Sequence, residues 1–237
     1  MGVLTGKKVL VMGGSRGIGA AIVRRLAADG GAVTFTYAGS KSAADALASE
    51  TGSTAMQADS ASRNAVIGAI QAVAPIDILV ISAGVFVYAD IREGDPDVID
   101  RMIDLNVRAP YHAASEAAKT MPDGGRIIII GSVNADAVPV TGASGYAMTK
   151  AAMQGLARGM ARDLGPNGIT VNVVQPGPVA TDMNPEHGDF ADALRSTMAI
   201  KRYARPEEIA GMVAYLAGPE AGIVTGAMHT IDGGFAC

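Results

Sequence analysis

The sequence predicts an α/β protein with a Rossmann-type, doubly wound sheet of seven parallel strands and helices on both faces. Three observations carry this prediction. Short apolar runs alternate with longer amphipathic stretches, the runs are apolar throughout, and a glycine-rich turn follows the first of them. Strands without polar alternation are buried on both faces, as in a parallel sheet covered by helices. No linker or break in composition interrupts the 237 residues, so we expect a single domain over 1–237.

The predicted elements follow from this pattern in chain order. The strands are expected at 8–12, 32–37, 53–58, 77–82, 126–132, 170–175 and 228–231. Helices are expected at 17–29, 42–50, 61–73, within 97–121, and at 145–164 and 206–217. Residues 177–200 show weak apolar periodicity and contain two prolines, so we expect a lid or substrate loop there.

Composition excludes several classes of function. Apolar residues make up 49% of the chain and charged residues 18%, which supports a large core. The net charge of −4 argues against a nucleic-acid polymer as partner, and 4% aromatic residues without tryptophan argue against stacking platforms. The lone cysteine, Cys237, allows no internal disulfide, and we predict no metal site. The N-terminus lacks the pattern of a signal peptide, and no apolar run approaches the ~18 residues needed to span a bilayer. We therefore expect a cytoplasmic protein that does not bind membranes.

The glycine-rich segment between the first strand and first helix is a candidate phosphate loop. It reads Gly13-Gly-Ser-Arg-Gly17-Ile-Gly19, which has the spacing Gly-x-x-x-Gly-x-Gly. Glycines let the backbone approach a pyrophosphate, and the helix N-terminus presents free N–H groups. The same residues would also suit a plain turn, but their position after the first strand favours a dinucleotide. The predicted contacts are Gly13, Ser15, Arg16, Gly17, Ile18 and Gly19.

The end of the second strand indicates which dinucleotide is bound. NAD-preferring sites place an acidic residue there, whereas this strand ends Thr36-Tyr-Ala-Gly-Ser-Lys41. Arg16, Ser40 and Lys41 could bind a 2′-phosphate instead, and Tyr37 and Ala38 belong to the same predicted site. Arg16 and Lys41 could equally be solvated surface charges. We predict NADPH/NADP⁺ as cofactor.

Tyr146 and Lys150 form the candidate catalytic pair. Residues four apart share one face of a helix, with Cβ atoms roughly 5–6 Å apart. A cation beside a phenol lowers the phenol pKa and so makes it a usable general acid or base. Ser132 ends the apolar run just upstream. The alternative is an exposed tyrosine–lysine pair on a helix surface.

Together these motifs resemble the short-chain dehydrogenases/reductases over nearly the whole chain. Further motifs appear in the family's order: Asp59 after the third strand, Ser82-Ala-Gly84 after the fourth, Asn106 in the long helix, and Pro176-Gly-Pro-Val-Ala-Thr181 after the sixth. The resemblance implies a hydride transfer between nicotinamide and a ketone or secondary alcohol. Tyr146 would be the general acid or base, Ser132 would bind the reacting oxygen, and Lys150 would bind the nicotinamide ribose and lower the pKa of Tyr146. Asn106 would hold a relay water.

The resemblance also implies the remaining cofactor contacts. Asp59 and Ser60 would lie at the adenine, and Ala83 and Gly84, which follow Ser82, would lie near a ribose. Four residues after the sixth strand would surround the nicotinamide: Pro176, Gly177, Val179 and Thr181. The chain departs from the family pattern at Met12, where threonine is usual, and at Ile81-Ser82, where two asparagines are usual. We expect apolar packing of Met12 and Ile81 to replace the polar contact.

Three segments, Phe35–Lys41, Gly125–Val133 and Ala227–Gly233, more closely resemble a bacterial subgroup that includes a cyclic-di-GMP-binding protein of biofilm dispersal. This resemblance implies a rival function, a signalling protein that binds a nucleotide messenger on a reductase scaffold. The intact catalytic set argues for the enzyme, and no second arginine-rich site for two phosphates is visible in the sequence.

Candidate substrate-pocket residues are Phe86, Tyr88, Val133, Val140, Met183 and Phe190, although each could be ordinary core. The family resemblance implies that the apolar C-terminal segment packs between subunits of a homotetramer.

Overall fold

The computed structural model describes residues 2–237 and confirms the predicted sheet. Its strands are β1 (Lys8–Met12), β2 (Ala32–Tyr37), β3 (Thr54–Gln57), β4 (Ile78–Ile81), β5 (Arg126–Ile130), β6 (Thr170–Pro176) and β7 (Met228–Ile231). The order is β3-β2-β1-β4-β5-β6-β7, and every neighbouring pair is parallel. The direction of winding reverses between β1 and β4. In such sheets ligands bind at the carboxyl ends of the strands beside this point.

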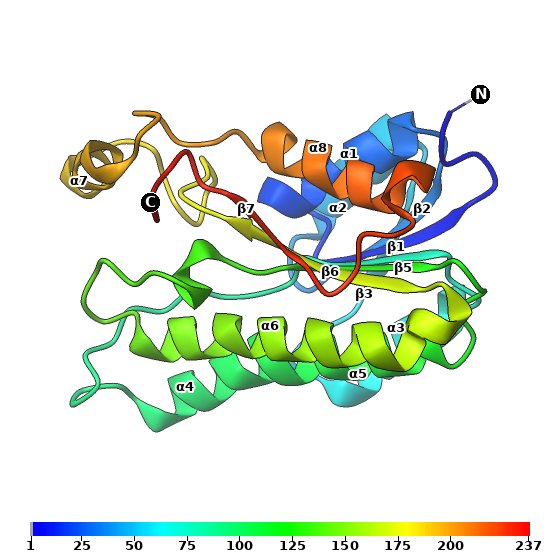
Figure 1. The fold of residues 1–237 in the computed structure, drawn as a ribbon, viewed down its shortest axis with the longest axis horizontal. Coiled ribbons are helices and arrows are strands. Elements are labelled where there is room, and N and C mark those ends of the chain that lie inside the picture. Colours follow the sequence, from blue (N-terminus) through cyan, green and yellow to red (C-terminus); the bar gives the residue numbers. More distant parts are fainter. Residues whose placement is uncertain (1) are drawn as a thin grey trace.

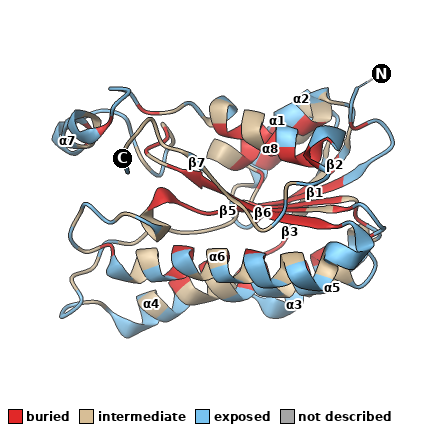
Figure 2. Cartoon of the chain, in the orientation of Figure 1, coloured by how far each residue is buried: buried red, intermediate tan, exposed pale blue. Residues whose placement is uncertain are grey.

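Helices cover both faces of the sheet (Figure 1). One layer holds α1 (Gly17–Ala28), α2 (Lys41–Thr51) and α8 (Pro206–Ala217). The other holds α3 (Arg63–Val73), α5 (Ala109–Ala118) and α6 (Ser144–Leu164), with α4 (Pro96–Ile103) preceding α5. Figure 2 shows the buried residues concentrated in the strands and on the inner helix faces.

Alternate strand residues enter the two halves of the core. Val9 and Val11 of β1 pack with the α1, α2 and α8 layer, whereas Leu10 and Met12 pack with the α3, α5 and α6 layer. All four are buried almost completely. This explains why the strand reads as continuously apolar: both faces of the pleat lie against helices.

The long helix expected within 97–121 is interrupted. After α4, residues Asp104–Arg108 form a π-helical turn, and α5 begins at Ala109. A π-helical turn is often found at a functional site, and this one carries Asn106.

The segment 177–200 is more ordered than its weak periodicity suggested. It contains α7 (Asp189–Thr197), which Figure 1 shows at one end of the molecule near the C-terminus. Only Ala191 of this helix is buried, and Phe190 is half-exposed, so the apolar face is too narrow to detect from the sequence. Isolated β-bridges stabilise the beginning of the segment; they join Val179 to Ala204 and Thr181 to Asn184.

Within residues 2–237, no helix is long and apolar enough to cross a membrane. The same residues include no group of three or more His, Cys, Asp or Glu side chains placed to bind a metal ion.

Candidate active site

The glycine-rich loop after β1 forms a backbone cradle with no room for a side chain at Gly13 or Gly19. Gly13 has a φ of +77°, and a Cβ placed on it would lie 2.7 Å from the Cα of Ala83. A Cβ on Gly19 would lie 2.0 Å from the carbonyl oxygen of Gly13. The cradle is also held by Thr36, whose Oγ1 accepts a hydrogen bond from the Gly13 N–H at 3.0 Å. A close backbone approach of this kind fits a pyrophosphate at the start of α1.

Thr36 was not predicted from the sequence, although it lies in the motif that ends β2. Its contact bears on the two departures from the family pattern. Met12 and Ile81 are register partners across β1 and β4, and both are buried in the same core cluster. The Ser82 N–H donates to the Met12 carbonyl at 3.0 Å. The two strands are therefore joined by apolar packing and backbone hydrogen bonds, as expected, while Thr36 supplies a polar contact to the loop.

The other predicted cofactor residues come together at the carboxyl ends of the strands, because each follows a parallel strand. They lie at or after the end of β2 (Tyr37, Ala38, Ser40, Lys41), after β3 (Asp59, Ser60), after β4 (Ser82, Ala83, Gly84) and at or after the end of β6 (Pro176, Gly177, Val179, Thr181). Thr181 reaches the glycine loop: a Cβ on Gly17 would lie 3.4 Å from its Cγ2.

Two of these residues have partners that the sequence did not reveal. The Lys41 ammonium is paired with Asp45 of the same helix at 2.7 Å, and both side chains are exposed. The Asp59 carboxylate accepts a hydrogen bond from the Ala61 N–H at 2.9 Å, in the turn before α3. Arg16 is exposed at the start of α1 and forms no ion pair with residues 2–237.

Ser132, Tyr146 and Lys150 meet where β5 ends against α6. Ser132 is buried and caps a 3₁₀ turn, its Oγ accepting from the Asn134 N–H at 3.1 Å. The Lys150 Nζ donates to the Ile130 carbonyl at 3.0 Å and lies 5.6 Å from the centre of the Tyr146 ring. The pair is thus not an exposed one: Lys150 is 7% exposed and Tyr146 is half-buried.

The expected lowering of the Tyr146 pKa by Lys150 is wrong for this structure. Burial raises the pKa of Tyr146 to about 12; the Ser132 side chain acts in the opposite direction, and Tyr88 adds to the increase. Burial also lowers the pKa of Lys150 to about 8. Desolvation disfavours the charged form of both groups, and for Tyr146 this effect of burial outweighs the nearby ammonium. Helical spacing predicted the contact but not this loss of solvent.

Asn106 is bonded to the chain at both ends of its amide. Its Oδ1 accepts from the Val85 N–H at 2.9 Å, and its Nδ2 donates to the Val85 carbonyl at 2.9 Å and to Thr149 Oγ1 at 3.1 Å. Thr149 precedes Lys150 on α6. Asn106 therefore joins the loop after β4 to the catalytic helix, a positioning role beside the relay role that the resemblance implies.

A row of aromatic rings leads from Tyr146 to α7. The Phe86 ring lies 4.4 Å from that of Tyr146 and 4.3 Å from that of Tyr88. Tyr88 in turn lies 5.9 Å from Phe190 on α7. Three of the six candidate pocket residues are thus brought together with Tyr146. Val133 is buried in the 3₁₀ turn instead, and Met183 is exposed.

A polar network that sequence reasoning missed holds the turn after Ser132. The Asp136 carboxylate accepts from Gln154 of α6 at 2.8 Å and from Gln175 of β6 at 2.5 Å. These two hydrogen bonds hold the pKa of Asp136 below its usual value. The three residues are separated in the chain and form no recognisable motif, so no sequence signal identified them.

Comparison with known proteins gives a consistent result. A family model described as enoyl-(acyl carrier protein) reductase matches residues 13–236. The chain is 62% identical over 235 residues to the cyclic-di-GMP-binding biofilm dispersal mediator protein of Escherichia coli, covering 99% of both chains. It is 34% identical to the 3-oxoacyl-[acyl-carrier-protein] reductase MabA of Mycobacterium tuberculosis, covering 96% of this chain and 92% of MabA.

Among solved structures, the chain is similar to BdcA in complex with NADPH. The TM-score is 0.97 at 62% identity, covering 99% of this chain and 96% of BdcA. A similar structure therefore holds the cofactor that the sequence predicted.

Proposed function

The chain belongs to the short-chain dehydrogenase/reductase family, and from this premise we propose that it is an NADPH-dependent carbonyl reductase. It would transfer hydride between the nicotinamide and a ketone or secondary alcohol. The observation that carries the proposal is the convergence of Ser132, Tyr146 and Lys150 beside the glycine cradle. A protein that only binds a nucleotide does not need this set.

The proposed chemistry assigns the proton to Tyr146. When bound, the nicotinamide supplies the hydride. Negative charge then develops on the carbonyl oxygen, which the Tyr146 hydroxyl protonates while the Ser132 hydroxyl donates a hydrogen bond to it. The raised pKa of Tyr146 keeps the phenol protonated at neutral pH, the state that a proton donor needs. Lys150, whose Nζ lies 5.6 Å from the centre of the Tyr146 ring, would bind the nicotinamide ribose.

NADPH is the proposed cofactor because its phosphates match the residues present. The glycine cradle suits the pyrophosphate, and Arg16 and Ser40 with Lys41 suit the 2′-phosphate. The ion pair of Lys41 with Asp45 is solvent-exposed and therefore weak, so Lys41 can exchange it for a phosphate. The NADPH complex of BdcA supports this assignment.

The aromatic row defines the proposed substrate side. Phe86 packs on Tyr146, and Phe190 of α7 closes the row at its outer end. We take residues 177–200 as the lid over this space. An apolar or aryl ketone of modest size fits such a wall better than a charged substrate.

A ketone panel tests the proposal. Wild-type protein should oxidise NADPH in the presence of at least one apolar ketone, and Tyr146→Phe should lose this turnover while still binding NADPH. Tyr215→Phe is a matched control, because Tyr215 is an exposed tyrosine on α8. Equal turnover in wild type and Tyr146→Phe would refute the assignment of the proton donor, and no turnover of any ketone would refute the reductase.

The proposed assembly is a homotetramer. An apolar groove of about 200 Å³ runs along α5 and α6, lined by Val107, Tyr111, Ala152, Met153 and Leu156 among others. An exposed tyrosine over such a groove suits contact with a second copy. Light scattering that returned the mass of a monomer would overturn this proposal.

Cyclic-di-GMP binding is the second candidate function. The observation that favours it is the 62% identity to the cyclic-di-GMP-binding biofilm dispersal mediator protein of Escherichia coli. A messenger-binding protein should bind cyclic-di-GMP equally well as wild type and as Tyr146→Phe, and show no turnover across the ketone panel. Calorimetry without measurable cyclic-di-GMP binding would eliminate this candidate.

A further inference from the structure

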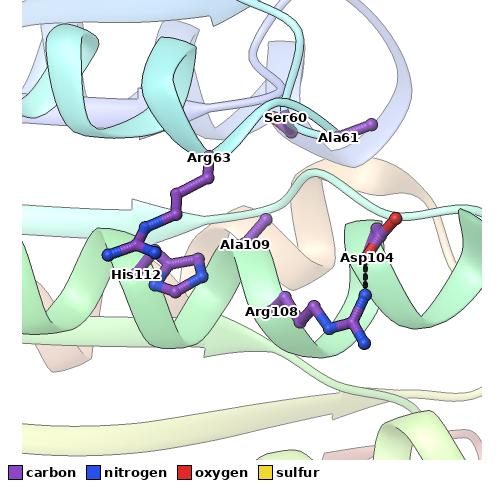
Figure 3. A pocket seen from close by; sticks show the side chains of 7 residues that line it. All are labelled: Ser60, Ala61, Arg63, Asp104, Arg108, Ala109 and His112. Carbon is purple, nitrogen blue, oxygen red and sulfur yellow. Dashed lines mark hydrogen bonds and ion pairs between the residues drawn. The ribbon is translucent and has the colours of Figure 1, made fainter.

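A hollow of about 350 Å³ lies outside the catalytic triad, between the start of α3 and the segment that carries Asn106. Its polar lining is Ser60, Arg63, Asp104, Arg108 and His112, shown in Figure 3. The volume falls in the range of pockets that hold small ligands. Two separate segments of the chain, 60–63 and 104–112, form it, which is why no arginine-rich site was visible in the sequence.

The charges in this hollow are not balanced. Arg108 is paired with Asp104, but Arg63 forms no ion pair with any residue of the described range 2–237. Figure 3 shows the Arg63 side chain extending from α3 toward His112 on α5. Two guanidinium groups and one imidazole thus face one carboxylate, in a chain whose net charge is −4.

The surrounding backbone adds to the positive potential. Helix α3 begins at Arg63 beside the hollow, is 11 residues long and has no acidic residue in its first turn. The N-terminal end of a helix carries a partial positive charge. Ser60, which precedes this helix, places a hydroxyl at the same edge.

We propose that this hollow is a second anion site that binds a phosphorylated small molecule, separate from the phosphate loop of the cofactor. Guanidinium groups match phosphate oxygens in geometry, and two of them with an imidazole can satisfy several oxygens at once. Arg63 is the main contact, because Arg108 must share its charge with Asp104.

Inorganic pyrophosphate is a suitable probe, provided that the cofactor site is first filled. The phosphate loop would bind pyrophosphate too, so the titration is done by calorimetry on protein saturated with NADP⁺. The proposal predicts one further pyrophosphate per chain. If NADP⁺ abolishes all pyrophosphate binding, the hollow is not a separate site and the proposal fails.

Variants of exposed arginines test the location. Arg63→Gln should weaken pyrophosphate binding at least about tenfold, the loss expected for a charge-assisted contact. Arg162→Gln is the control: it removes the same charge from an exposed arginine in the last turn of α6 and should bind like wild type. Equal weakening in both variants would show non-specific attraction and overturn the proposal. So would a changed oligomer mass for Arg63→Gln with unaltered pyrophosphate binding, which would mark an interface between copies.

Discussion

Replacing Asn106 by alanine tests how the site is held together. The amide makes three hydrogen bonds, two to the backbone of Val85 and one to Thr149 Oγ1, and its residue is 2% exposed. Each hydrogen bond contributes about 1 kcal/mol, so Asn106→Ala should lower the free energy of unfolding by about 3 kcal/mol. Thr149→Val removes only the last of these contacts and the bond from Thr149 to the Tyr146 carbonyl. At the same value for each bond, it should cost about 2 kcal/mol.

Equilibrium unfolding in urea measures both costs, and steady-state kinetics measures their effect on the site. Because Asn106 joins the loop after β4 to α6, its loss should lower kcat roughly ten- to hundredfold by misplacing Tyr146. Asn106 does not hold the site together if Asn106→Ala is as stable as wild type, or if it loses stability while kcat stays unchanged.

Three further predictions concern charge and backbone. The pKa of Lys150 is about 8 in the folded chain and 10.5 in the unfolded chain, so between these pH values only the unfolded chain keeps the proton. The free energy of unfolding should therefore rise with pH over this window by up to about 3 kcal/mol. Lys150→Met should flatten that rise in urea titrations. Gly13→Ala should lower the free energy of unfolding by about 2–4 kcal/mol and weaken NADPH binding, because φ is positive and the new Cβ would meet Ala83. Gly52 also has a positive φ but open space around it, so Gly52→Ala should cost only about 1 kcal/mol in the same urea titrations. Arg16→Gln should raise the KM for NADPH about tenfold and leave that for NADH unchanged; an equal rise for both cofactors would show that Arg16 does not bind the 2′-phosphate.

The fold was predictable because burial on both faces leaves a direct signal. The β1 residues Val9 to Met12 are apolar without alternation, and the structure places them between two helical layers. Parallel strands then bring their carboxyl ends to one edge, so residues that follow different strands were expected to meet.

Features that depend on distant contacts were not predictable. The π-helical turn is held by Asn106, whose partners Val85 and Thr149 lie 21 and 43 residues away. The pKa of Tyr146 depends on burial that local helical spacing does not encode. Arg63 and His112 belong to separate helices with unremarkable sequences, and only the packing of α3 against α5 places them in one hollow.

The central claim is that Tyr146 protonates a carbonyl oxygen while hydride reaches the carbonyl carbon. NADPH deuterated at the transferable position of the nicotinamide tests this most directly, with the product analysed by mass spectrometry and NMR. We predict one deuterium on the carbinol carbon with wild-type protein and no product with Tyr146→Phe, although that variant still binds NADPH. Deuterium lost to solvent would rule out direct hydride transfer, and labelled product formed as fast by Tyr146→Phe as by wild type would rule out Tyr146 as the proton donor.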